Sequence, residues 1–83
     1  MKDIYDTVQP LISHCYQLLG KPYTMVGEKT LRNDLSLIDE YLEITTDVFL
    51  EYGLQKDWEP NTFGLQLEEV INCLLKIRYE IVR

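Results

Sequence analysis

Residues 34–53 read DLSLIDEYLEITTDVFLEYG, and this stretch decides the fold class of the chain. Its hydrophobic residues recur every three or four positions, which predicts an amphipathic helix that ends at Gly53. Ser36 begins a Ser-x-x-acid pattern with Asp39, so we expect Ser36 to cap the start of this helix. The side chains expected on its buried side are Leu35, Ile38, Tyr41, Leu42, Thr45, Val48, Phe49 and Tyr52.

The same predicted helix carries a stripe of negative charge. Asp39, Glu43, Asp47 and Glu51 follow one another at four-residue intervals, and Glu40 stands beside them. Side chains at positions i and i+4 are neighbours on a helix, and like charges at that spacing cost a few tenths of a kcal/mol per pair. A basic partner accounts for this repeated cost, and so does an ordinary solvated helix face.

Helices are also predicted on both sides of this segment. A first helix is expected from about residue 3 to residue 19, and Gly20 ends it. Pro10 either kinks that helix or lies in its first turn, in which case the regular part begins near Val8. Residues 20–33 read as a long connection, and a connection of this length must be either packed or functional.

The third predicted helix is a short turn at residues 63–65, and the last helix covers about residues 65–82. Asn61 or Thr62 is expected to cap the helical segment that follows the connection at residues 54–62. The expected fold class is therefore all-α. It is a small antiparallel four-helix bundle with three main helices and a short third one, forming a single domain over residues 1–83.

Composition narrows the function classes. The net charge of −6 over 83 residues argues against nonspecific binding to nucleic acid or to an anionic membrane, and it permits a basic protein partner. No apolar run approaches the roughly 20 residues of a membrane span. The N-terminus is polar and acidic rather than a signal peptide, so we expect a cytoplasmic protein.

Cys15 and Cys73 each lie in an apolar run, which favours buried free thiols over a disulfide.

No catalytic motif is present, and we expect no enzyme. His14 precedes Cys15 directly, so on a helix the two side chains point about 100° apart and cannot face each other as a catalytic pair. One histidine and two distant cysteines make a poor zinc site, and no calcium loop or phosphate-binding glycine loop occurs. Trp58, between Asp57 and Glu59, either covers the end of the bundle or is an exposed anchor for a partner.

Three segments resemble acyl carrier proteins. Residues 30–35 (TLRNDL) look like the segment before that family's second helix, and residues 49–53 (FLEYG) resemble the end of that helix. The spacing of Leu67, Val70, Ile71 and Leu74 is similar to that of the family's last helix. The resemblance implies a carrier-like bundle whose second helix is recognised by basic partner enzymes. The acidic stripe, Asp39, Glu40, Glu43, Asp47 and Glu51, would then be the docking surface, with Trp58 as a further contact.

The family's Gly-x-Asp-Ser-Leu motif, whose serine carries 4′-phosphopantetheine, is not preserved. Alignment on the later part of the helix puts Ile38 or Asp39 in the serine position, and neither can be modified. An alignment with a three-residue loop deletion puts Ser36 there instead, followed by Leu37 as in the family. We prefer the first alignment, which implies a carrier-like domain without its prosthetic group. The second would make Ser36 the attachment point for 4′-phosphopantetheine.

An inhibitor of a toxin is the competing hypothesis. Nuclease toxins have basic active sites, and an acidic helical face can occupy such a site and steer association. The Tyr-Tyr-Pro turn of colicin-DNase immunity bundles is absent from this sequence, so such an immunity protein would belong to a different group.

Overall fold

Four helices make up the computed structural model, which describes residues 4–82 of the chain and the side chains from residue 8 onward. They are α1 (Ile4–Leu18), α2 (Glu28–Arg32), α3 (Leu35–Tyr52) and α4 (Thr62–Val82). Within the described residues there is no strand, only one isolated bridge between Leu54 and Pro60. The predicted all-α class is confirmed. The predicted start of the first helix, Asp3, lies outside the described residues.

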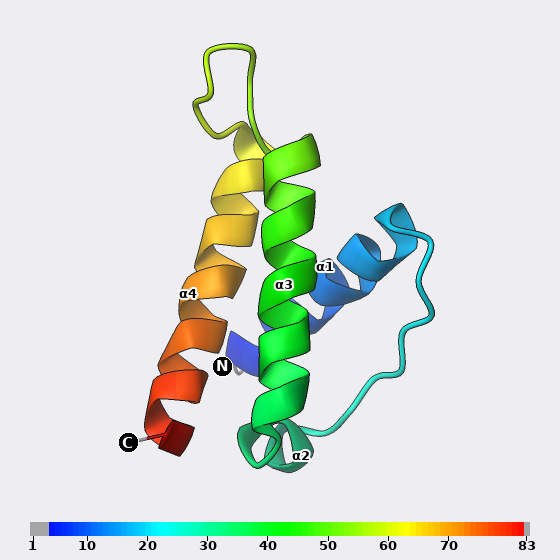
Figure 1. Ribbon diagram of the computed structural model, residues 1–83, viewed down its shortest axis with the longest axis vertical. Coiled ribbons are helices and arrows are strands. Elements are labelled where there is room, and N and C mark those ends of the chain that lie inside the picture. Colours follow the sequence, from blue (N-terminus) through cyan, green and yellow to red (C-terminus); the bar gives the residue numbers. More distant parts are fainter. Residues whose placement is uncertain (1–3, 83) are drawn as a thin grey trace.

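The long helices α3 and α4 run antiparallel, and α1 crosses behind them obliquely (Figure 1). The bundle is therefore an α3–α4 hairpin with α1 packed across it, rather than a set of near-parallel rods. One apolar core lies between α1, α3 and α4, because each presents a stripe of hydrophobic residues to the others, and α2 adds one side chain to it. Its fully buried members are Ile12, Cys15, Leu31, Ile38, Tyr41, Val48, Leu67, Val70 and Leu74.

The short helix was predicted in the wrong place. Residues 63–65 belong to α4, which begins at Thr62 because Asn61 caps it: the Asn61 side chain accepts a hydrogen bond from the Gly64 N–H at 2.7 Å. The short helix is α2, inside the segment predicted as a connection. It forms because Leu31 is completely buried and because Arg32 pairs with Glu28 one turn earlier.

Pro10 lies inside α1, which already begins at Ile4. The alternative in which regular helix starts near Val8 is therefore wrong. Cys15 and Cys73 are both buried and neither forms a disulfide, which confirms the prediction of two buried thiols rather than a disulfide.

Two glycines set the distance between α3 and α4 at the hairpin end. A Cβ on Gly64 would overlap the carbonyl oxygen of Gly53, and a Cβ on Gly53 would lie 3.0 Å from the Gly64 Cα. The Asn61 N–H also donates to the Gly53 carbonyl at 2.9 Å. The backbones of the two helices thus touch, and this contact anchors the loop between them.

A cluster of three tyrosine rings holds residues 21–27 against α1 and α3. The Tyr23 ring packs at a tilt against Tyr16, with ring centroids 5.1 Å apart, and against Tyr41, at 6.2 Å. The Tyr23 hydroxyl donates to the Gln9 side chain, which in turn donates to the Val26 carbonyl at 3.1 Å. The predicted long connection is therefore packed onto the core.

Candidate protein-docking surface

The predicted acidic stripe winds around α3 instead of following one line. Each four-residue step on an α-helix turns the side chain by roughly 40°, so three steps turn it by roughly 120°. Asp39 lies on the side of α3 that faces α4, because it pairs with Arg78 there. Glu40 lies on the side that faces α1, because it contacts Tyr16. The stripe consequently divides into residues with different neighbours.

Asp39 is part of an ion pair within the molecule. The Arg78 Nε atom donates to its Oδ1 atom at 2.8 Å, and both side chains remain about half exposed. An exposed pair of this kind contributes about 0–1 kcal/mol, so it orients the two side chains more than it stabilises the fold. Asp39 is thus already neutralised and is a weaker candidate for partner binding than the sequence suggested.

Glu40 has a structural role as well. The Tyr16 hydroxyl donates to its Oε2 atom at 2.7 Å, which ties α1 to α3. Burial of Tyr16, reinforced by this hydrogen bond to the negative carboxylate, raises the pKa of the tyrosine. Glu40 acts here as the acceptor for a partly buried hydroxyl, a role that no local pattern in the sequence indicates.

Glu43, Asp47 and Glu51 form the remaining acidic triad, and their side chains are exposed. None of them makes an ion pair with another described residue. The two arginines in this part of the chain pair elsewhere: Arg32 with Glu28 and Glu80, and Arg78 with Asp39. The triad is therefore the part of the predicted stripe whose charge is not compensated within residues 4–82.

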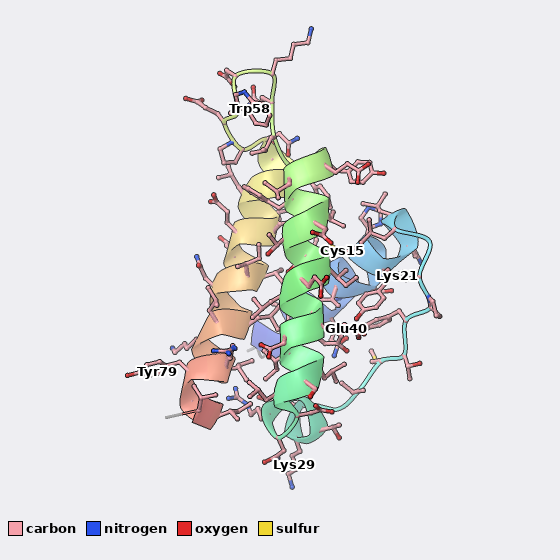
Figure 2. All side chains as sticks on the ribbon, in the orientation of Figure 1. Cys15, Lys21, Lys29, Glu40, Trp58 and Tyr79 are labelled. Carbon is pink, nitrogen blue, oxygen red and sulfur yellow. The ribbon has the colours of Figure 1, made fainter. Side chains whose placement is uncertain are left out.

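Residues 54–60 form a hairpin that extends beyond the ends of α3 and α4, and Trp58 lies in it (Figure 2). The indole is 78% exposed, so Trp58 does not cover the end of the bundle. Of the two sequence-based interpretations, the covering one is wrong. The exposure required by the other is confirmed, and a role as an anchor for a partner stays a prediction.

Ser36 is exposed in the first turn of α3, but it is not the cap predicted for that helix. The cap is Asp34, whose carboxylate accepts a hydrogen bond from the Leu37 N–H at 3.0 Å. Asp34 is the cap because its backbone is extended, as a cap requires, whereas Ser36 already lies within the helix. The exposed hydroxyl is open to modification, as an attachment point for 4′-phosphopantetheine requires, but most serines at helix starts are equally open.

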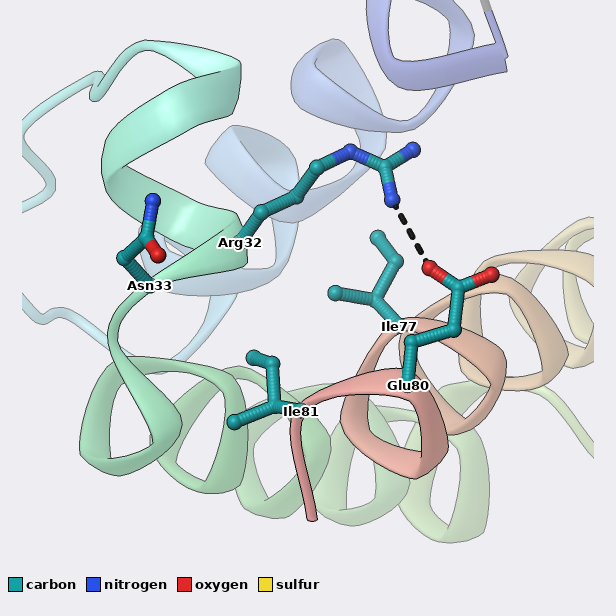
Figure 3. A pocket seen from close by; sticks show the side chains of 5 residues that line it. All are labelled: Arg32, Asn33, Ile77, Glu80 and Ile81. Carbon is teal, nitrogen blue, oxygen red and sulfur yellow. Dashed lines mark hydrogen bonds and ion pairs between the residues drawn. The ribbon is translucent and has the colours of Figure 1, made fainter. Parts of the chain in front are cut away.

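A hollow on the surface is a candidate ligand site. It has a volume of about 310 Å³ and lies between α2 and α4, where Arg32 crosses it to Glu80 at 3.1 Å (Figure 3). Because Arg32 already has two carboxylate partners, this hollow offers little free charge to a ligand. Its ion pair fastens the short helix to the C-terminal half of α4.

Sequence reasoning missed several residues at the hairpin end. Leu50 is 60% exposed, and a helical wheel could have shown this, since it places Leu50 opposite the buried Tyr41. Tyr52 was predicted to be buried and is 42% exposed, because it is the last residue of α3 and lies beyond the core. Asn61, Gly53 and Gly64 shape the hairpin through contacts between helices, for which the local sequence carries no signal.

No protein-family model, curated protein or solved structure matches this chain. Among residues 4–82, no three histidine, cysteine or acidic side chains converge as a metal site requires. None of the described helices is both long enough and apolar enough to span a bilayer. The exposed features of this surface are the acidic side chains of α3 and the tryptophan of the hairpin.

Proposed function

We propose that this chain is an acidic protein-interaction module that docks a basic protein partner through the triad Glu43, Asp47 and Glu51. The observation that carries the proposal is that these three charges have no partner in the described part of the molecule, while Asp39 and Glu40 do. Uncompensated like charges along a helix are locally unfavourable, and a cationic partner surface relieves that repulsion.

The resemblance to acyl carrier proteins supports the same helix as the docking element. In this proposal the domain is carrier-like and acts without a prosthetic group, because the modified serine of the family has no counterpart in the preferred alignment. If Ser36 is instead a functional attachment point, incubation with a phosphopantetheinyl transferase and coenzyme A will add one phosphopantetheine mass at Ser36. Peptide mass spectrometry distinguishes the two cases.

A toxin inhibitor is the second candidate, and the hairpin favours it. An exposed aromatic residue on a projecting loop, next to an acidic helix, has the shape and charge to enter a basic cleft. Such an inhibitor needs no cargo and no attachment serine. A gene for a nuclease next to this one would favour the inhibitor, whereas neighbouring synthase genes would favour the carrier-like module.

The test of the docking proposal is charge reversal on α3. We expect the double substitution Glu43→Lys/Asp47→Lys to weaken binding of the natural partner at least about 10-fold, a loss of about 1.4 kcal/mol. The affinity of the wild-type chain should fall as the salt concentration rises, because salt screens the attraction between the triad and the basic partner. The partner is first isolated by affinity purification of the wild-type chain, and its dissociation constant is measured by calorimetry.

The matched control is Glu68→Lys/Glu69→Lys, which changes the net charge equally at exposed positions on α4. This control variant should bind within about twofold of the wild type. Equal weakening by both double variants would show that only the net charge matters, and unchanged binding by the α3 variant with an intact fold would exclude the triad.

A further inference from the structure

Trp58 adopts a backbone conformation that costs free energy. Its φ is +67°, in the left-handed region where glycine is favoured and bulky side chains are rare. A strained residue in a core can be stabilised by the burial of its side chain, but this indole is 78% exposed. Neither the backbone conformation nor the exposure of Trp58 stabilises the fold. Residues held in rare backbone conformations cluster at functional sites.

Hydrogen bonds hold the hairpin in one shape despite this strain. The Trp58 N–H donates to the Gln55 carbonyl at 3.0 Å, and the Gln55 N–H donates to the Glu59 carbonyl at 2.7 Å. The Asp57 carboxylate accepts from the Glu59 N–H at 3.2 Å. At the base, the Asn61 side chain donates to the Tyr52 carbonyl at 3.0 Å. A loop ordered in advance loses little entropy when it binds, so the tryptophan is presented as a preformed contact.

The surroundings of Trp58 indicate what it contacts. Further exposed hydrophobic side chains lie at this end of the molecule, at Leu50 and Tyr52 on α3 and at Leu65 on α4. The charged residues of the same end are mostly acidic: Glu51, Asp57 and Glu59 against Lys56. An aromatic anchor surrounded by charge is the usual anatomy of an interface hot spot, and tryptophan is strongly enriched there.

We propose that Trp58 is the anchor residue of this module and enters an apolar cleft, rimmed by lysine or arginine, on a basic protein partner. The acidic residues beside it select that partner by charge and disfavour an anionic membrane. This inference rests on the proposed function, since it places the hairpin on the same partner that the acidic triad of α3 contacts. It adds the residue that supplies affinity, whereas the triad supplies long-range attraction.

The experiment begins by finding what lies next to the hairpin in cells. A photoreactive Lys56→p-benzoylphenylalanine variant leaves Trp58 in place, and irradiation crosslinks the protein in contact with it. We expect a single basic protein, identified by mass spectrometry. A crosslink only to a second copy of this chain, only to lipid, or to nothing would overturn the proposal.

The purified crosslinked protein is then titrated with the wild-type chain, Trp58→Gly, Trp58→Phe and Glu43→Lys/Asp47→Lys. We expect at least 30-fold weaker binding for Trp58→Gly and a smaller loss for Trp58→Phe, which keeps an aromatic ring. If Trp58→Gly binds like the wild type while the charge reversal weakens binding, the anchor is wrong and the proposed function stands. If only Trp58→Gly weakens binding, the proposed role of the triad fails and the anchor stands.

A thermal melt without any partner tests the strain argument. Glycine tolerates the left-handed conformation and alanine does not, so the Trp58→Gly variant should melt at a higher temperature than Trp58→Ala. If Trp58→Gly melts lower than Trp58→Ala, the conformation of Trp58 is no local cost, and the inference loses its basis.

Discussion

Gly64 shows how one missing side chain determines the geometry of the hairpin. A Cβ at this position would overlap the Gly53 carbonyl, which is backbone and cannot rotate away. We expect Gly64→Ala to destabilise the protein by about 1–3 kcal/mol, because the gain in helix propensity is smaller than the cost of forcing the two backbones apart. Urea unfolding followed by circular dichroism measures the difference.

Gly27 provides the matched control for this substitution. A Cβ on Gly27 meets no atom within 4 Å, and its φ of −72° suits any residue. Gly27 is the N-cap of α2, where alanine is less favourable than glycine, but alanine also restricts the unfolded chain. Gly27→Ala should therefore change stability by less than about 1 kcal/mol. If the two variants lose similar stability, the close contact between Gly53 and Gly64 is not what the fold requires.

The beginning of α3 depends on Asp34 rather than on the serine that the sequence pattern suggested. Asp34→Ala removes the hydrogen bond to the Leu37 N–H and should lower the free energy of unfolding by about 1 kcal/mol. Ser36→Ala changes an exposed side chain and should stay within about 0.5 kcal/mol of the wild type. Urea denaturation midpoints of the two variants measure these changes. A larger loss of stability for Ser36→Ala than for Asp34→Ala would show that Ser36 is the cap.

The packing of α1 against the rest of the molecule makes stability sensitive to alkaline pH. Burial raises the pKa of the Cys15 thiol from 9.0 to about 11, and burial also raises the pKa values of Tyr16 and Tyr23. Each group is neutral when protonated, and its pKa is higher in the folded state than in the unfolded state. The stability that these groups contribute is complete below about pH 9 and is lost as the pH rises through the folded-state values.

We therefore expect the urea midpoint to fall between about pH 9 and pH 11. The free energy of unfolding should fall with a limiting slope of about 1.4 kcal/mol per pH unit for each proton that the unfolded state releases first. Cys15→Ala removes one titrating group and should flatten the first part of this decline, although the smaller side chain lowers stability at every pH. A midpoint that stays constant up to pH 11 would contradict the predicted linkage.

Much of the fold could be predicted from local patterns. The extent of α3, the greater part of α4, the buried positions Ile38, Tyr41 and Val48, and the two buried thiols follow from hydrophobic spacing along single helices. The short helix was misplaced because α2 depends on the burial of Leu31 by other elements. Only part of the candidate site was predictable. The acids were recognised as surface residues, but their individual partners were not, and the sequence left open whether Trp58 covers the end of the bundle or is exposed.

The sequence by itself determined that the acidic residues of α3 lie on its solvent side, since their spacing opposes that of the apolar residues. Only the packed molecule distinguished among them. Asp39 pairs with Arg78, 39 residues away, and Glu40 accepts from Tyr16, 24 residues away, which leaves Glu43, Asp47 and Glu51 without an ion pair among residues 4–82. Likewise, the contact between Gly53 and Gly64 positions the hairpin that exposes Trp58. The physical reason is that periodicity sets the face of a helix, whereas contacts between distant segments decide which groups on that face find partners.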